Sequence, residues 1–366
     1  MVPYFIVALI TGFTHGLNNG FKTMPLDTLI VLIKLSLGKE TSVSLSNDVN
    51  WQAVYEMALK QGVGAIACDG LLKLENIGID EELRYKWMGQ SMVVEQRSSM
   101  QWNIASEMAE LFSREGIKTI ALKGISFASY YPTPLHRSSS DIDISLLDNF
   151  ERGNQIVESE GFPVDREDSK HSHYVVNGIP VENHQFCIGV RGNRRNKRVE
   201  RRFRQLLREG EETIGDSKVI RPQWLFNALF FMYHAMNHLL IGGGITLKYI
   251  CDWIVLRDSV EDNDSMAAFW NECDKLGLTK IAKAIDRVCD YMMKDVELDE
   301  SGSELLKRIL VTKEPHESKS KDQAHLGMIR TMWRNRQMFR DFSDTTAVRV
   351  ITTYVWGYLF DRNPKL

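Results

Sequence analysis

Two aspartates lie within an otherwise apolar run near the middle of the chain. Residues 136–147 read HRSSSDIDISLL, in which Asp141 and Asp143 alternate with Ile142 and Ile144. Alternation with a period of two predicts a strand, so both carboxylates project from the same face. At about 5 Å and an effective dielectric of about 20, two such charges repel by about 3 kcal/mol. A positive charge is therefore expected between them.

A candidate anion site precedes the aspartates. The run IKTIALKG at 117–124 predicts a short strand, and the following ISFASYY predicts a brief helix. Gly124 would let the backbone approach an anion, and the first helical turn, with the Ser126 hydroxyl, would offer donors to phosphate oxygens. Lys123 adds a positive charge. Carboxylates on the neighbouring strand suit Mg²⁺ or Mn²⁺, which would bridge them to a triphosphate and neutralise the aspartate pair.

A β-hairpin is predicted farther along the chain. In HSHYVVNGIPVENHQF, two β-rich runs flank Asn177-Gly178, the pair typical of a two-residue type I′ turn. This turn sets His173 opposite Glu182 and His171 opposite His184, with all four side chains on one face. If that face lies beside the aspartates, Glu182 completes a three-carboxylate metal site, and His173 orients it. The alternative is a surface pair between Glu182 and His173.

The surrounding sequence has the spacing of helices. Apolar periodicity predicts helices near 26–37, 51–61, 81–115 and 148–161, and helix from 191 to the end. The expected fold class is α+β, a small mixed-sheet core flanked by N-terminal and C-terminal helical regions. Four parts are expected: an uncertain N-terminal extension, a helical region, the α/β core and a second helical region, at 1–23, 24–116, 117–190 and 191–366.

Composition limits the class of protein. The 366 residues are 43% hydrophobic, enough for a large core, and the formal net charge of −3 argues against a generic nucleic-acid binder. Five cysteines without metal-ligand spacing are typical of a reducing cytoplasm, so a cytoplasmic protein without disulfides is expected. The sequence contains no run of about 20 apolar residues, so no membrane association is expected.

One segment is strongly basic. Residues 191–208 carry nine Lys or Arg residues. They could form a contact surface for nucleic acid, polyphosphate or an acidic partner. A solvated helix face is the favoured interpretation, because Phe203 is the one aromatic residue among them.

Other polar residues have two interpretations each. Arg137 either pairs with the first aspartate or binds a phosphate. His234 and His238 have the i, i+4 spacing that can chelate a metal, although packed core histidines more often show it. Lys248 and Asp252 have the same spacing and are expected to form an ion pair. Lys248 remains a candidate for triphosphate binding.

Together these motifs resemble a known family. LKGISFASYYPTPLHRSSSDIDISLL, a helix ending at Gly161 and the later VENH are similar to the uncharacterised nucleotidyltransferases of the DNA polymerase β-like superfamily. That family shares a Lys-Gly, a Tyr-Pro, an Arg, an Asp-x-Asp and a Glu-x-His. These fall here at Lys123-Gly124, Tyr131-Pro132, Arg137, Asp141–Asp143 and Glu182–His184. Residues 225–253 also resemble the family's C-terminal region, so the resemblance covers roughly 24–260.

The resemblance implies nucleotidyl transfer from an NTP to an acceptor hydroxyl, with pyrophosphate leaving. With the site chemistry, it implies that Asp141, Asp143 and Glu182 hold one or two Mg²⁺ (or Mn²⁺). The residues expected around the nucleotide are Lys123, Gly124, Ser126, Arg137, His173, His184 and Lys248. The partners are an NTP and an acceptor that the sequence does not specify, and nucleic acid is not favoured.

Two alternatives from other classes stay open. One is a non-catalytic module that uses the basic segment 191–208 to hold an anionic partner, and this alternative predicts salt-sensitive binding that ignores Mg²⁺. The other is a transition-metal hydrolase built on His171, His173 and His184, which predicts tightly bound zinc or manganese.

Overall fold

The computed structural model describes residues 24–361 apart from 41, 42, 44, 46, 47, 167, 168, 261 and 313–320, and it also describes residue 366. The expectations for 1–23 lie outside these residues. Mixed α/β architecture is confirmed: helices surround a single six-stranded mixed sheet in the described part of the chain. None of the described helices combines the length and the apolar character that crossing a bilayer requires.

The sheet brings together segments from the middle of the chain. Its strands are β1 (Thr119–Leu122), β2 (Ile142–Ser145), β3 (His171–Val176), β4 (Ile179–His184), β5 (Glu211–Thr213) and β6 (Val219–Pro222). Their order is β3-β4-β2-β1-β6-β5. β1 pairs antiparallel with β2 and parallel with β6, whereas β4 pairs parallel with β2. The parallel pair β2–β4 places the predicted Asp-x-Asp strand beside the predicted hairpin.

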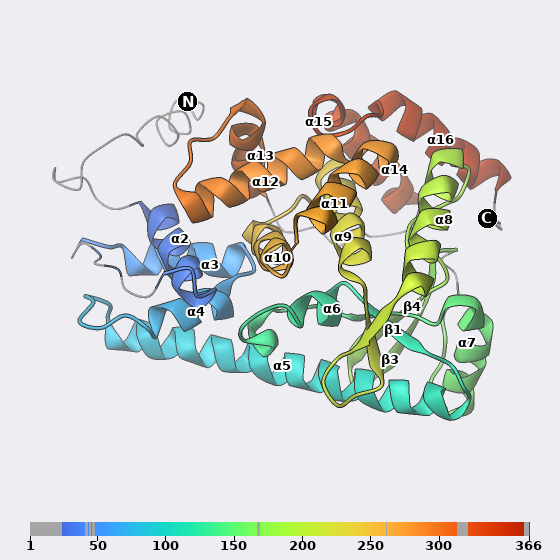
Figure 1. Ribbon diagram of the computed structural model, residues 1–366, viewed down its shortest axis with the longest axis horizontal. Coiled ribbons are helices and arrows are strands. Elements are labelled where there is room, and N and C mark those ends of the chain that lie inside the picture. The colour runs from blue at the N-terminus through green and yellow to red at the C-terminus, as the bar shows by residue number, and fades with distance from the viewer. Residues whose placement is uncertain are drawn as a thin grey trace.

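The N-terminal part of the chain is helical, and its last helix covers one face of the sheet. The helices are α2 (Pro25–Ser36), α3 (Trp51–Lys60), α4 (Gly64–Leu71) and the long α5 (Glu81–Arg114). The buried side chains of α2, α3 and α4 join the core cluster of the C-terminal helices. α5 begins at Asp80, whose carboxylate accepts a hydrogen bond from the N–H of Leu83. It runs beneath the strands in Figure 1, and its Phe112 belongs to the same buried cluster as Ile142 and Ile144 of β2. Since Asp143 alternates with these isoleucines, its carboxylate projects from the opposite face.

The C-terminal helices lie over that opposite face (Figure 1). They are α8 (Arg194–Glu209), α9 (Trp224–Leu240), α10 (Leu247–Asp258), α11 (Asn263–Leu276), α12 (Thr279–Lys294), α13 (Glu300–Val311), α14 (Lys321–Arg334), α15 (Arg336–Phe342) and α16 (Ala347–Phe360). Here Phe127 makes an edge contact with Phe231 of α9 at 5.8 Å between ring centroids. Ile120 and Leu122 of β1 join this larger core cluster.

Short elements connect the sheet to its helices. They are α6 (Gly124–Ala128), α7 (Phe150–Ser159) and two single 3₁₀ turns, η1 (Pro134–His136) and η2 (Leu147–Asn149). α7 packs on the α5 side, where Ile156 and Val157 join the cluster that contains Ile142. The observed helix is two residues shorter at each end than the helix predicted at 148–161. At the N-terminal end, the first predicted residues form η2.

Two expectations about secondary structure were wrong. Helix was expected throughout 191–366, but β5 and β6 form the far edge of the sheet, and β6 pairs in parallel with β1 through Thr119 and Val219. A four-residue strand has too little periodicity to be found alone and needs a distant partner to satisfy its backbone. α4, which packs against α2 and α5, was also missed.

Candidate active site

The hairpin register sets the third carboxylate beside the aspartates. β3 and β4 pair as the turn predicts, with Val176 opposite Ile179, His173 opposite Glu182 and His171 opposite His184. β4 in turn pairs with β2 so that Glu182 is the partner of Asp143. Directly paired residues project to the same face, so Glu182 and Asp143 share a side of the sheet. The register is confirmed.

Asp143 is a buried carboxylate with two basic partners. It is 3% exposed, and its Oδ1 accepts from Lys123 Nζ at 2.6 Å and lies 2.8 Å from His184 Nε2. Burial alone raises the pKa of Asp143, but the Lys123 charge and the bond to His184 outweigh burial and hold it well below its usual range. Lys123 therefore supplies a positive charge beside Asp143, one of the two aspartates.

Lys123 reaches this position from a strained turn. It follows β1 directly and has φ 46° and ψ −114°, a left-handed backbone that non-glycine residues rarely adopt. Burial lowers the pKa of its ammonium, but the charge and hydrogen bond of Asp143, together with the charges of Glu182 and Asp141, outweigh burial and raise it. At the next residue, a Cβ on Gly124 would lie 2.7 Å from Ser139 Oγ, so glycine allows the loop before β2 to pack here.

Asp141 shares the cavity in a different environment. It precedes β2, is half-buried and lines the same cavity as Asp143 and Glu182. Burial raises its pKa, and repulsion from Asp143 raises it further. A cation that enters the cavity would relieve this repulsion.

His184 holds Asp143 and Glu182 together. Its Nε2 lies 2.8 Å from Asp143 Oδ1 and 3.2 Å from Glu182 Oε2. Because both oxygens contact the same nitrogen atom, Asp143 Oδ1 and Glu182 Oε2 lie close to each other. Hard cations can bridge two carboxylates at such a separation. Burial raises the pKa of Glu182, but its bond to His184 together with the charges of His171 and Lys123 outweighs burial and lowers it.

The His184 ring lies between a carbonyl group and two carboxylates. Its Nδ1 lies 3.3 Å from the carbonyl oxygen of Phe186, and its Nε2 faces Asp143 Oδ1 and Glu182 Oε2. Carboxylate oxygens accept hydrogen bonds, so Nε2 can donate to them when it carries the ring proton.

A mixed nitrogen and oxygen cluster adjoins the carboxylates. Ligand atoms of His171, Glu182 and His184 all lie within 4.8 Å of one another. His171 Nε2 is 3.6 Å and His173 Nδ1 is 3.7 Å from the same Glu182 oxygen. The expected contact between His173 and Glu182 is thus present at ion-pair range. The residues fit either an oxygen-rich site for Mg²⁺ on the carboxylates or a His-Glu-His site for a softer metal.

A cavity of about 450 Å³ lies between the sheet and the C-terminal helices, and its sheet wall includes Asp141, Asp143, His171 and Glu182. His173 and His184, which were expected around the nucleotide, are not among its lining residues. Its helical wall is formed by His234, Asn237 and His238 of α9 and by Lys248, Tyr249 and Asp252 of α10. Lys248 Nζ donates to the Ser138 carbonyl at 3.4 Å, and burial, with the nearby Arg137 charge, lowers its pKa to about 8. The sequence pointed to Lys248 through its i, i+4 spacing with Asp252, but Asn237 and Tyr249 carried no motif and were missed.

Arg137 fixes the loop through a partner that neither interpretation named. Its guanidinium donates to Asp252 through Nε at 3.0 Å and Nη2 at 2.7 Å, and Tyr131 donates to the same carboxylate at 2.8 Å. Pairing of Arg137 with Asp141 was therefore wrong, as was pairing of Lys248 with Asp252. A planar guanidinium matches both carboxylate oxygens at once, which an ammonium cannot do.

Ser126 does not line this cavity. Its side chain is fully buried, and its hydroxyl donates to Asn227 Oδ1 of α9 at 3.1 Å. The expected phosphate contact was wrong, because the hydroxyl of this residue of the short helix α6 faces α9. Gly124, by contrast, lines the cavity.

The two α9 histidines are packed against each other. Rings of His234 and His238 lie 4.3 Å apart between centroids, and both line the cavity. Burial, reinforced by the Lys123 charge, lowers the pKa of His238 to about 4 and that of His234 well below its usual range. Both rings are therefore neutral at physiological pH and available as hydrogen-bond acceptors.

Much of the basic segment 191–208 is paired with neighbouring elements. Arg202 pairs with Glu272 at 2.9 Å, and Arg208 pairs with Asp148 at 2.7 Å. Arg195 donates to the carbonyls of Leu276 and Gly277. The apolar side chains of helix α8, Phe203 among them, are buried. These contacts support the interpretation of a structural helix with a solvated face.

Comparison with known proteins gives one finding. The family model described as uncharacterised nucleotidyltransferase matches residues 47–294, more than half of the chain. That range contains all six strands and the whole cavity. No curated protein and no solved structure matches significantly.

Proposed function

The chain belongs to the family of uncharacterised nucleotidyltransferases, and from this premise we propose that it transfers a nucleoside monophosphate from an NTP to an acceptor hydroxyl by Mg²⁺-dependent chemistry. The observation that carries the proposal is the convergence of Asp141, Asp143 and Glu182 on one cavity that three lysines also line. In the reaction, the acceptor oxygen bonds to the α-phosphorus. The bond to the bridging oxygen breaks, pyrophosphate leaves with the electron pair, and the hydroxyl proton passes to solvent.

The carboxylates are suited to a hard divalent cation. Their oxygens are the ligands that Mg²⁺ and Mn²⁺ prefer, and the raised pKa of Asp141 marks a site where added positive charge is favourable. Mg²⁺ held there would lower the pKa of the acceptor hydroxyl and neutralise charge on the phosphates. Asp143 and Glu182 are held in place for this role by His184.

The lysines are placed for the triphosphate. Lys123 Nζ contacts Asp143, so its ammonium lies beside the proposed metal site and can pair with a phosphate oxygen when a metal neutralises Asp143. Lys248 lies in the opposite wall, on α10. Two cations from opposite walls would hold the leaving pyrophosphate and offset the charge that develops on it.

Calorimetric titration of the purified protein with each NTP, with and without Mg²⁺, tests the proposal. We expect Mg²⁺-dependent binding that Asp141→Asn abolishes, whereas Asp216→Asn, an exposed aspartate in the turn before β6, leaves it unchanged. Equal nucleotide affinity in Asp141→Asn and the unaltered protein would contradict the metal-site assignment.

A second candidate function is supported by the His171–Glu182–His184 cluster. A zinc or manganese ion bound there would suit a hydrolase. The third ligand of this cluster is Glu182 and not the expected His173, whose side chain is 41% exposed. The discriminating measurement is elemental analysis after purification. Stoichiometric zinc that His171→Gln removes would favour the hydrolase, whereas metal that binds weakly and only with nucleotide would favour the transferase.

The non-catalytic alternative makes a different prediction. A module that holds an anionic partner through segment 191–208 would bind with an affinity that salt weakens and Mg²⁺ does not change. The pairing of Arg195, Arg202 and Arg208 within the fold gives it less support than the carboxylate cavity gives the transferase.

A further inference from the structure

Resting on this proposed function, we propose that the Lys123 ammonium and a divalent cation compete for the Asp143 carboxylate, so that the cation binds firmly only together with the nucleotide. Lys123 balances the charge of the carboxylates before the nucleotide arrives. The triphosphate then takes over the ammonium and leaves Asp143 to the cation. This exchange makes the metal and the nucleotide bind as one unit.

The contact between Lys123 and Asp143 occupies a carboxylate that a metal would need. Lys123 Nζ lies 2.6 Å from Asp143 Oδ1, and His184 Nε2 lies 2.8 Å from the same oxygen. A carboxylate oxygen accepts about two hydrogen bonds, so these partners together fill Oδ1. A metal at the other oxygen would share the carboxylate with the ammonium, and the two positive charges would repel each other. Firm metal binding therefore requires the ammonium to move.

All three carboxylates of the site stabilise the charge of Lys123. Burial, the largest effect, lowers the pKa of its ammonium. The charge and hydrogen bond of Asp143, with the charges of Glu182 and Asp141, outweigh burial and raise it. The ammonium therefore offsets part of the negative charge of the cavity. A divalent cation beside it gains less electrostatic stabilisation from the carboxylates than it would without the ammonium.

The backbone of Lys123 is a second, independent observation. Its φ of 46° and ψ of −114° lie in a region that glycine adopts readily and other residues rarely. The Lys123 carbonyl accepts from the N–H of Phe127 at 2.6 Å, which holds the backbone, whereas the four-carbon side chain can rotate. Backbone strain of this kind is concentrated at functional sites. A lysine in a position that suits glycine indicates a need for its ammonium.

The nucleotide would meet Lys123 inside the carboxylate cavity. This cavity of about 450 Å³ is lined by Lys123 at the end of β1 and by Lys248 in the helical wall. An ammonium forms charge-assisted hydrogen bonds with phosphate oxygens, so the triphosphate offers Lys123 a partner in place of Asp143. Exchange of one ionic partner for another costs less than moving the ammonium away without a new partner. A metal that arrives alone offers no such partner.

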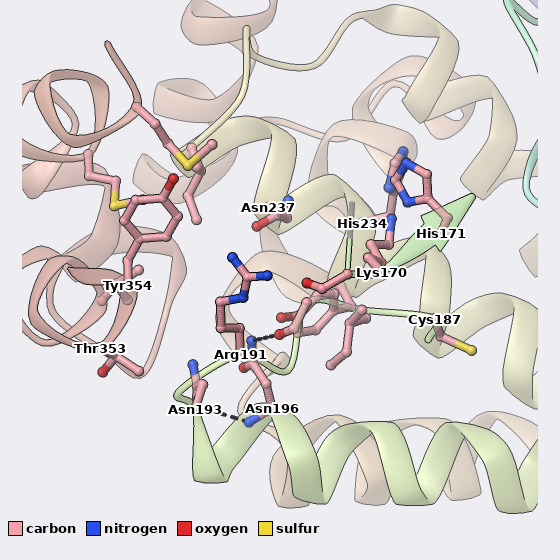
Figure 2. Close-up of a pocket in the computed structure, with 18 of the residues that line it drawn as sticks. Lys170, His171, Cys187, Arg191, Asn193, Asn196, His234, Asn237, Thr353 and Tyr354 are labelled. Atoms are coloured by element: carbon pink, nitrogen blue, oxygen red, sulfur yellow. Dashed lines mark hydrogen bonds between the residues drawn. The ribbon is translucent and has the colours of Figure 1, made fainter. Parts of the chain in front are cut away.

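A second cavity of about 490 Å³ adjoins the carboxylate cavity. Four residues line both cavities: Lys170, His171, His234 and Asn237. Figure 2 shows His171 and His234 on one side of the second cavity and Tyr354 on the other. Lys123 is not among the described residues that line it. A ligand confined to the second cavity would therefore leave the pair of Lys123 and Asp143 intact, whereas a ligand in the carboxylate cavity can separate it.

Metal binding without nucleotide tests the inference. Mn²⁺ shares the preference of Mg²⁺ for carboxylate ligands, and electron paramagnetic resonance measures its free concentration. We expect Lys123→Met to bind Mn²⁺ at least about tenfold more tightly than the unaltered protein, because the competing charge is absent. A lysine with only a structural role would give the opposite result, since its loss would loosen the carboxylates. Lys123→Gly should show the same gain, and it relieves the backbone strain, which favours folding.

Two controls locate the effect. Lys248→Met removes a positive charge from the same cavity, but Lys248 donates to the Ser138 carbonyl. Its loss should raise Mn²⁺ affinity by less than about threefold. In the double variant Lys123→Met/Asp143→Asn, the contested carboxylate is absent, so the gain from Lys123→Met should disappear. The two neutral side chains also avoid an unpaired buried charge in this variant.

A nucleotide measurement tests the second half of the exchange. Mn²⁺ affinity is measured with and without non-hydrolysable α,β-methylene ATP, after subtraction of the Mn²⁺ that free nucleotide binds. We expect the analogue to raise the affinity of the unaltered protein about a hundredfold, and Lys123→Met to reduce this coupling at least about tenfold. Coupling between two ligands is reciprocal, so Mn²⁺ should increase the nucleotide affinity of Lys123→Met by correspondingly less.

Four results would overturn the competition: Mn²⁺ affinity that neither Lys123 variant increases, an equal increase in Lys248→Met, a gain that persists in the double variant, or undiminished coupling in Lys123→Met. Failure of the proposed function is a separate result. It would appear as absent or Mg²⁺-independent nucleotide binding by the unaltered protein. The Mn²⁺ measurements without nucleotide decide the competition in either case.

Discussion

Lys123 and Asp143 form an ion pair of 2.6 Å in which the carboxylate side chain is 2% exposed and the lysine side chain 13% exposed. The pair joins the end of β1 to the middle of β2, and His184 reaches the same carboxylate from β4. Three neighbouring strands thus contribute to one buried charge network. Mutations in this network should change the free energy of unfolding by more than mutations of the exposed charges of this chain.

The two aspartates should differ in their effect on stability. Asp143→Asn leaves Lys123 without its buried partner and should lower the free energy of unfolding by about 3–5 kcal/mol. Asp141→Asn removes a repelled charge whose pKa is raised, first by burial, so stability at pH 7 should stay equal or rise. Urea unfolding in metal-free buffer measures both. Equal destabilisation by the two substitutions would show that Asp143 is not the anchored member.

Lys248 should give stability a distinct pH dependence. Its pKa is lowered from 10.5 to about 8, mainly by burial, so between these values the unfolded chain binds more protons than the folded chain. Stability should therefore rise as pH increases from about 8 to 10.5 relative to Lys248→Met, which lacks this titration. Thermal unfolding of both proteins across that range provides the comparison. If the stability of the two proteins depended on pH in the same way, the Lys248 ammonium would be exposed to solvent and not buried.

The same titration should affect nucleotide binding. The charged form of Lys248 attracts a triphosphate, so Mg²⁺–NTP affinity should decrease as pH rises above about 8. Calorimetry at pH 7 and pH 9 should show this decrease in the unaltered protein and a smaller one in Lys248→Met. An identical decrease in both proteins would remove Lys248 from the nucleotide site.

The buried Arg137–Asp252 pair should be structural. Asp252→Ala leaves a buried guanidinium and should cost about 3–5 kcal/mol of unfolding free energy. The exposed pair of Arg208 and Asp148 serves as the control, because Arg208→Ala should change stability by less than about 1 kcal/mol. Chemical denaturation of the two variants side by side gives the contrast. A small effect of Asp252→Ala would mean that Arg137 finds another partner.

The exposed arginines of α8 should be dispensable for catalysis. Arg198 and Arg201 are exposed, and reversing both to glutamate should keep Mg²⁺–NTP affinity within a few-fold, because salt screens exposed charges beyond about 8 Å. Nucleotide titration at physiological ionic strength checks this. Loss of binding in the double variant would move α8 into the active site.

The sequence by itself determined the local geometry of the site. The Asn177-Gly178 turn sets the register of β3 and β4, because a two-residue turn leaves one way to pair the flanking residues. Alternation along β2 likewise separates Asp143 from Ile142 and Ile144. Both features depend on residues close in the chain, so their spacing alone was sufficient to predict them.

Tertiary structure alone decided which charges pair. Arg137 meets Asp252, which lies 115 residues later in the chain, and nothing in the spacing around Arg137 identifies that partner. The sequence assigned Ser126 to a phosphate, but its hydroxyl donates to Asn227 of α9. The sequence around Ser126 does not show how α6 is oriented against α9. β6 is stabilised as a strand by its parallel pairing with β1, which satisfies the hydrogen-bonding groups of its backbone. Local patterns fix dihedral angles and faces, whereas burial, ion pairs and the shape of the cavities depend on which distant elements pack together.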